Sequence, residues 1–149
     1  MFRQTHRRAA GAVLAAAVLA LAGGTAAQAK HATIHLTQAT AHPQPVFVDT
    51  GKPGPSVGDV VVVRDALLPQ GTLNQVCTLV NVSGGPLTSD YECTGSIALA
   101  DGTITMAGPF NPAKAAETAA ITGGTGAYAR ARGEIVVRAE ADELLVRLI

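Results

Sequence analysis

Short runs of β-branched and aliphatic residues, separated by glycine and proline turns, fill this 149-residue chain from about residue 57 to its end. Such runs are typical of β-strands, because branched side chains pack well on a pleated surface. A helical turn is conceivable only over Pro112–Ala120. About eight strands at close, even spacing predict an all-β domain, most simply a small closed antiparallel barrel, with a sandwich as the alternative.

One predicted hairpin brings the two cysteines of the chain together, which indicates a disulfide. Apolar runs at 73–82 and 91–100 flank a polar turn centred on Gly85, which places Cys77 opposite Cys93. A disulfide there would enclose 15 residues, a loop worth about 3 kcal/mol in the chain-entropy model. Two buried thiols are the alternative. No metal site is expected, because neither cysteine has His or carboxylate partners at ligand spacing.

A second hairpin is predicted at Asp101-Gly102, a dipeptide typical of a type I′ turn. The expected register pairs Leu99 with Ile104 and Ile97 with Met106. In this register the apolar residues of both hairpins share one face; they are Leu73, Cys77, Leu79, Cys93, Ile97, Leu99, Ile104 and Met106.

The remaining strands are predicted from composition. Val60–Val63 is a continuous β-branched run, which indicates a strand buried on both faces. The last strands are expected over residues 117–122, 127–137 and 143–149.

The N-terminal segment is typical of a secretory signal peptide over residues 1–29. Arg3, Arg7 and Arg8 form a basic start, residues 9–22 form an apolar stretch, and Ala27-Gln28-Ala29 supplies a small-x-small cleavage signal. The apolar stretch is shorter than the ~20 residues that span a membrane. We therefore expect a secreted, extracellular protein, and a retained anchor is the alternative.

Residues 30–56 are expected to hold a weak strand at 32–39 and a proline-rich loop at 41–56, with a short extended piece at Val46–Val48. The barrel domain is expected over residues 57–149. The histidines of the segment are interpreted as solvated; they are His31, His35 and His42. Without the signal peptide the chain has three more acidic than basic residues, so no nucleic-acid partner and no membrane surface are expected.

The glycine-rich stretch Thr122–Gly126 has two interpretations. It matches the start of a dinucleotide-binding loop, but the chain ends too soon afterwards for the remaining strands of such a sheet. The alternative is a turn between two barrel strands. In this interpretation Gly123, Gly124 and Gly126 allow positive φ angles and a close approach between the backbones of neighbouring strands.

Residues 121–133, Ile-Thr-Gly-Gly-Thr-Gly-Ala-Tyr followed by Arg-Gly, resemble the late signature of plant dirigent proteins and allene oxide cyclases. Residues 58–67 resemble the early strand motif of the same families. The stretches 77–80, 91–92 and 102–110 resemble successive strands in the same order. The resemblance covers residues 57–138, and the glycine motif is its most specific part.

The resemblance implies an eight-stranded antiparallel barrel of the allene oxide cyclase type, often trimeric, with a mostly apolar cavity. It implies catalysis by holding a reactive ligand in one conformation, with a few polar groups for proton transfer. Cyclases of this group carry Pro-Phe-Thr-Asn where this chain has Val62-Val63-Arg64-Asp65. The position of Asp65 is closer to the dirigent pattern.

Three residues are candidates for catalysis. Asp65 ends a run of valines, so its carboxyl group could lie in a partly desolvated cavity and exchange protons with a ligand; a solvated carboxylate paired with Arg64 is the alternative. Tyr91 could place a hydroxyl inside the barrel or at its rim. Arg132 could reach the cavity or a neighbouring subunit, or form a surface ion pair with Glu134.

Two functions follow. The first is a secreted dirigent-like or cyclase-like protein that binds a small hydrophobic or phenolic ligand and directs its cyclisation or coupling, with no cofactor. The second is a non-catalytic secreted barrel that binds a ligand or packs in an assembly. An outward row of Val76, Val80 and Val82 is either a subunit interface of a dimer or trimer or simple surface.

Overall fold

The structure is a computed structural model that describes residues 32–39 and 45–149. The predicted signal peptide, His31 and His42 lie outside these residues. The described part contains nine strands and two short 3₁₀ turns. In chain order these are β1 (Ala32–Gln38), β2 (Val46–Val48), β3 (Val60–Leu68), β4 (Thr72–Asn81), β5 (Asp90–Leu99), β6 (Gly102–Phe110), β7 (Glu117–Gly124), η1 (Gly126–Tyr128), β8 (Gly133–Arg138), η2 (Ala139–Ala141) and β9 (Glu143–Leu148).

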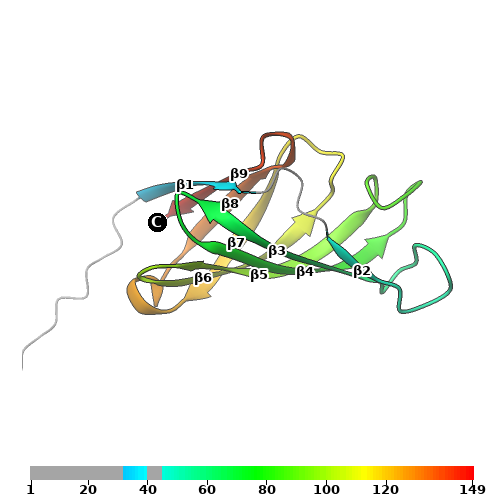
Figure 1. Cartoon of the computed structure of the whole chain (residues 1–149), viewed down its shortest axis with the longest axis horizontal. Coiled ribbons are helices and arrows are strands. Elements are labelled where there is room, and N and C mark those ends of the chain that lie inside the picture. Colours follow the sequence, from blue (N-terminus) through cyan, green and yellow to red (C-terminus); the bar gives the residue numbers. More distant parts are fainter. Residues whose placement is uncertain (1–31, 40–44) are drawn as a thin grey trace, which may run out of the picture.

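Eight of these strands form a closed barrel. The hydrogen-bonded order is β1-β9-β8-β7-β6-β5-β4-β3, and β1 pairs in turn with β3. Every pairing is antiparallel, and β1 pairs with β9 and β3, whereas each of the other pairings joins strands that are consecutive in the chain. The predicted eight-stranded antiparallel barrel is therefore confirmed. Figure 1 shows the strands curling into this barrel.

Strands β1 and β2 share one edge of β3. Gln38 of β1 lies opposite Leu67, whereas Val48 of β2 lies opposite Val60. Both therefore run in the same direction along β3, one beyond the other. The expected strand at 32–39 and the expected extended piece at Val46–Val48 are both present.

The two ends of the barrel differ. One end, here called the turn end, carries the connections 69–71, 100–101 and 125–132. The other, here called the loop end, carries the connections 49–59, 82–89, 111–116 and 139–142, of which the first two lie at the right of Figure 1. No helix of the described part is long and apolar enough to cross a membrane.

Alternation along the strands separates an inner from an outer face, because successive side chains of a strand point in opposite directions. The main core cluster fills the barrel interior; its buried members are Leu36, Leu67, Leu73, Ile97, Ile104, Met106, Ile121, Ala131, Ile135, Leu144, Val146 and Leu148. A smaller cluster lies towards the loop end and contains Cys77, Leu79, Tyr91 and Cys93, with Val61 and Phe110 packed against it.

The register of the first hairpin agrees with the sequence. Cys77 lies directly opposite Cys93, and the two form a disulfide. A bulge follows between Leu79 and Asn81. The disulfide prediction is confirmed.

The register that the sequence predicted for the second hairpin is wrong by two residues. Ile97 lies opposite Ile104, and Leu99 lies opposite Gly102. The two-residue loop is therefore Ala100-Asp101, not Asp101-Gly102. Gly102 belongs to the strand because the backbone of Thr125 approaches it closely: a Cβ there would lie 2.2 Å from the Thr125 carbonyl oxygen. The shift is by two residues, so the predicted inner face is unchanged.

Three smaller expectations also fail. Val60–Val63 is not buried on both faces, because Val62 points outward and is 37% exposed; the outer face of this barrel has no covering layer in the described chain. Residues 127–132 form η1 and a turn, and the strand begins only at Gly133. Residues 112–116 form turns and no helix.

The glycine motif joins β7 to β8 and packs on the neighbouring β5–β6 turn. Ala127 N–H donates to the Asp101 carbonyl, 2.9 Å away. Gly126 has φ +58°, and a Cβ there would lie 2.3 Å from the Asp101 carbonyl oxygen. The stretch is followed by a strand rather than by the helix that a dinucleotide loop requires. It closes the turn end of the barrel.

Candidate ligand site at the loop end of the barrel

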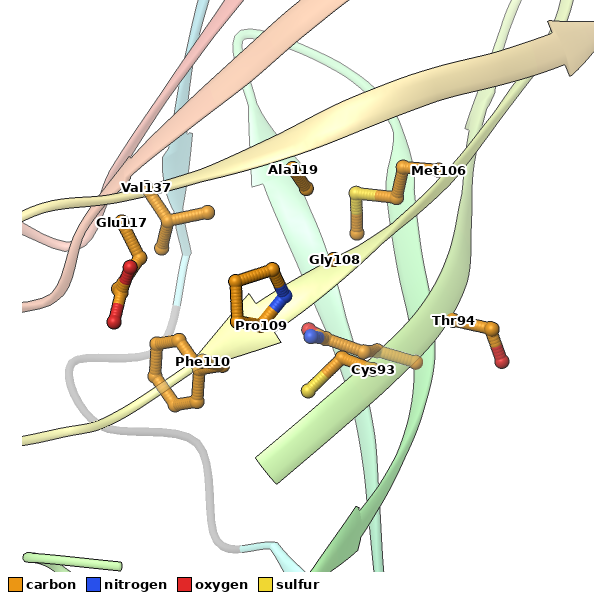
Figure 2. A pocket seen from close by; sticks show the side chains of 10 residues that line it. Cys93, Thr94, Met106, Gly108, Pro109, Phe110, Glu117, Ala119 and Val137 are labelled. Atoms are coloured by element: carbon orange, nitrogen blue, oxygen red, sulfur yellow. The ribbon is translucent and has the colours of Figure 1, made fainter. Parts of the chain in front are cut away.

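A narrow cavity lies inside the barrel towards the loop end (Figure 2). Its volume is about 20 Å³, room for about one water molecule. It is lined by residues of β4 to β8: Gln75, Cys93, Thr94, Met106, Gly108, Pro109, Phe110, Glu117, Ala119 and Val137. The rest of the interior is filled by the main core cluster. The described part of the barrel is therefore largely packed, with this cavity towards the loop end.

Two inward glycines allow the strands beside the cavity to pack closely. Gly95 and Gly108 occupy inward positions of β5 and β6, opposite Met106 and Cys93 respectively. A Cβ on Gly108 would lie 2.9 Å from the Ala119 Cα atom, so β6 and β7 approach closely only because residue 108 is glycine. The β6–β7 ladder ends at Ala107 and Ala120. Beyond it the two strands continue without ladder bonds towards Phe110 and Glu117, at the cavity mouth.

Asp65 points into the barrel from β3. It is 7% exposed and lies opposite Leu73 of the main core cluster. Its Oδ1 accepts a 2.9 Å hydrogen bond from the Ala66 N–H, whereas its buried Oδ2 has no hydrogen-bond partner among the described residues. Arg64 is exposed on the opposite face of the same strand, so alternation separates the two charges.

Gln75 lines the cavity on the strand that neighbours Asp65, whereas Asp65 itself is not among the lining residues. Gln75 lies on the inner face of β4 opposite Gly95. Its β3 partner is Val63, two residues before Asp65. Asp65 and Gln75 are thus diagonal neighbours on one face, at a spacing of roughly 7–8 Å in an antiparallel pair.

Glu117 stands at the mouth of the cavity. Its side chain is 12% exposed, and its Oε1 lies 2.7 Å from the Lys114 Nζ. Figure 2 shows its carboxylate beside Phe110 and Val137. The hydrogen bond and the charge of Glu117 raise the pKa of Lys114 above its ordinary value. The pair therefore ties the 111–116 loop to the barrel.

The half-buried carboxylate of Asp90 also holds the 111–116 loop. Asp90 accepts hydrogen bonds from the amide groups of Asn81 and Asn111, at 2.9 Å and 2.8 Å. These bonds, together with the nearby charge of Lys114, lower the pKa of Asp90. Asn111 in turn accepts a bond from the Ala113 N–H. The loop beside the cavity is thus fixed by polar contacts and not by apolar packing.

Tyr91 forms part of the barrel wall at the loop end. Its ring is buried, and its hydroxyl donates a 2.9 Å hydrogen bond to the Pro86 carbonyl oxygen in the 82–89 connection. Burial, and secondly the charge of Asp59, raise the pKa of this hydroxyl. The hydroxyl thus lies at the rim, one of the two positions that the sequence allowed.

Asp59 holds the 49–59 connection through hydrogen bonds. It is fully buried, and its carboxylate accepts bonds from the Thr50 and Ser56 N–H groups at 2.9 Å and 2.7 Å, and from their hydroxyls. The Thr50 backbone bond is the main cause that lowers the pKa of Asp59, ahead of the Ser56 bonds. The sequence analysis did not single out this residue.

Arg132 lies at the turn end, away from the cavity. Its side chain is exposed and donates to the Ala131 carbonyl oxygen, 2.9 Å away. Glu134 pairs with Arg147, at 2.8 Å, so the predicted alternative of an Arg132–Glu134 ion pair is wrong. A role for Arg132 towards a ligand or a second subunit stays a prediction.

A second hollow lies on the outer face of β3 to β7. It is shallow, with a volume of about 640 Å³. Short side chains dominate its floor; those that point outward are Val62, Arg64, Asn74, Val76, Thr94, Ser96, Thr105, Ala107 and Thr122. Val76, Val80 and Val82 are 44%, 48% and 42% exposed, so the outward row expected from the sequence is present.

Among the described residues, no group of three or more His, Cys, Asp or Glu side chains is placed to hold a metal ion. His35 lies on β1 with its side chain 69% exposed, and its Nδ1 is 3.7 Å from Glu143.

Sequence reasoning missed Glu117 and Gln75. A signal was present for Glu117, because Glu117, Ala119 and Ile121 recur at every second position of one strand, and the alternation that buries Ile121 also turns Glu117 inward. Gln75 follows in the same way from Leu73 and Cys77.

The fold and the site together define a small antiparallel β-barrel with a partly polar internal cavity at one end. The model of the allene oxide cyclase barrel-like domain matches residues 31–148. The chain belongs to the allene oxide cyclase barrel-like family.

Among the solved structures similar to the chain are the following two. One is a pyocyanin demethylase, 33% identical, with a TM-score of 0.64; the match covers 79% of this chain and 98% of that one. The other is the Diels-Alderase AbmU from Streptomyces koyangensis, 18% identical, with a TM-score of 0.52; the match covers 83% of this chain and 72% of that one. The second likeness concerns the fold alone. No curated protein matches the chain.

Proposed function

We propose that this protein is exported, binds a small apolar or aromatic molecule inside its barrel, and uses Asp65 to exchange a proton with that molecule. The observation that carries the proposal is the buried Oδ2 of Asp65, which has no hydrogen-bond partner among the described residues in an otherwise aliphatic interior. Buried polar atoms without a partner are rare and are costly unless they serve a ligand or a reaction.

The residues that line the cavity support ligand binding there. Gln75 and Glu117 offer polar contacts at the cavity, while Met106 and Phe110 offer soft apolar surface that can yield to a ligand. Holding a reactive molecule in one conformation there would direct its cyclisation or coupling, the chemistry that the family resemblance implies.

The 33% identical relative is named for a reaction on pyocyanin, which makes this compound the first substrate to test. Export is supported by the disulfide, since such bonds persist in oxidising compartments. Self-association through the outward valines stays a prediction.

A matched pair of variants tests the site. Ala119 faces the cavity, whereas Ala120 is exposed on the outer face of the same strand. Ala119→Leu would fill the cavity, so it is expected to lower affinity for pyocyanin or another bound aromatic more than about tenfold, whereas Ala120→Leu leaves affinity unchanged. Equal effects would place the ligand elsewhere, and the outer hollow would be the next location to test.

Asp65→Asn tests the chemistry. If Asp65 transfers a proton, the variant loses about 10²- to 10⁴-fold in turnover while ligand binding remains. Turnover that survives the change contradicts the acid–base role. The packed interior favours a second candidate, a non-catalytic ligand-binding barrel. This function would be supported if ligands bind but none of the substrates tested is turned over.

A further inference from the structure

Gln75 is the polar side chain of the cavity that has no partner among the described residues. The polar residues that line the cavity are Gln75, Thr94 and Glu117. Thr94 is exposed on β5, and Figure 2 shows its side chain pointing away from the other labelled side chains. Glu117 pairs with Lys114 at 2.7 Å. The amide group of Gln75 makes no hydrogen bond with any other described residue.

The neighbours of Gln75 on the inner face offer its amide group little to bind. The residues directly opposite it, or next to it on the inner face of its own strand, are Val63, Leu73, Cys77 and Gly95. None of their side chains forms a strong hydrogen bond. Asp65, the diagonal neighbour on β3, accepts a bond from the Ala66 N–H and none from Gln75. The cavity is therefore where a partner for the amide group can bind.

The amide group of Gln75 does not stabilise the fold. A primary amide has two donor hydrogens and an acceptor oxygen, and their burial without hydrogen bonds opposes folding. An apolar side chain of the same length would suit the apolar neighbours better. A polar group that costs stability at the wall of a cavity indicates a role towards a bound molecule.

The size of the cavity limits what can lie beside this amide group. A volume of about 20 Å³ is room for one hydroxyl or carbonyl oxygen and not for an aromatic ring. The ring of a ligand must therefore displace side chains that line the cavity. Met106 is an unbranched thioether, and Phe110 is only half-buried, so both can yield. A polar group on the ring can then reach Gln75.

We propose that Gln75 selects the ligand of the internal site by hydrogen bonding to a hydroxyl or carbonyl group on an aromatic ring. The amide group can donate to either oxygen and can accept from a hydroxyl. This inference rests on the proposed function for the location of the site and for the aromatic class of ligand. It adds the polar group that the ligand carries and the residue that recognises it.

Two probes of nearly equal size test the preference: 1-hydroxyphenazine and 1-methylphenazine. Their binding to the unaltered protein is measured by equilibrium dialysis at mildly acidic pH, where both are uncharged. We expect 1-hydroxyphenazine to bind about tenfold more tightly, the worth of about one net hydrogen bond. Equal binding, or tighter binding of the methyl compound, overturns the role of Gln75 while the proposed aromatic site stands. Absence of binding by both probes contradicts the proposed function as well.

A matched pair of variants assigns the preference to Gln75. Gln75→Met keeps the length of the side chain and removes its hydrogen-bonding groups, so it should bind the two probes equally. Its thermal unfolding midpoint should be unchanged or higher, because an amide group without a partner is lost. Asn74→Leu, which removes an amide group from the exposed outer face of β4, should keep the preference for the hydroxyl compound.

Two results would contradict this assignment. A preference that persists in Gln75→Met would show that another group recognises the hydroxyl. A Gln75→Met protein that unfolds, or that melts well below the unaltered protein, would show that the amide group holds the fold and not the ligand.

Discussion

The turn end and the loop end of this barrel are stabilised by different means. At the turn end, fully buried aliphatic side chains such as Ile97 and Ile104 pack across the strands, and the glycine motif binds its neighbouring turn through backbone contacts. At the loop end, a disulfide, the Tyr91 hydroxyl and the carboxylates of Asp59 and Asp90 hold the connections. Aliphatic side chains pack the first end. Polar contacts leave a cavity at the second, which is where ligand chemistry can be accommodated.

The comparison predicts the largest loss of stability at the turn end. Ile104 is fully buried opposite Ile97, so Ile104→Ala should lower the free energy of unfolding by about 4 kcal/mol through lost burial and the cavity left behind. Val80→Ala, on the exposed outer face, should cost under about 0.5 kcal/mol. Chemical denaturation measures both; similar losses would mean that the interior is not packed as described.

Removal of the disulfide should have a somewhat smaller and more local effect. The double variant Cys77→Ser, Cys93→Ser opens a loop between residues 16 apart in sequence, worth about 3 kcal/mol in the chain-entropy model. Hydrogen exchange should show the loss of protection concentrated in β4 and β5 near residues 77–82 and 90–93. Uniform loss over the whole barrel, the turn end included, would contradict the division into two ends.

Acid should weaken the loop end first. The folded-state pKa values of Asp59 and Asp90 are lowered by the hydrogen bonds that their carboxylates accept. Their contribution to stability is therefore complete above the ordinary unfolded value of about 3.9. It is lost as the pH falls through that value towards the lower folded pKa, because the unfolded chain binds protons first.

Hydrogen exchange and tyrosine fluorescence between about pH 5 and pH 2 follow this loss. Asp90→Asn should make the loop end less stable near neutral pH and less sensitive to acid. Asp101→Asn, exposed in the β5–β6 turn, should leave the acid dependence unchanged. An acid transition that begins at the turn end would be the contrary result.

Much of the fold was predictable because its signals are local. Alternation and turn residues predicted the barrel, the shared inner face and the Cys77–Cys93 bond. The register predicted for the second hairpin was wrong. Gly102 lies against the backbone of Thr125, which is far from it in sequence, and is not one of the two residues of the turn. Asp65 was singled out from its position after a valine run, and it is buried as expected, while its catalytic role stays a prediction. Glu117 and Gln75 were missed, although their inward positions follow from alternation.

The sequence by itself determined which side chains face inward, since the two-residue period of a strand is a property of the chain. That period also separated Asp65 from Arg64, one residue apart on opposite faces. Only the tertiary structure decided that Asp65 and Glu117 enter the same interior and that Oδ2 of Asp65 has no partner among the described residues. It also decided that the free space lies at the loop end. These facts depend on closure of the barrel, in which β1 meets β3, and on how residues far apart in sequence fill the enclosed volume.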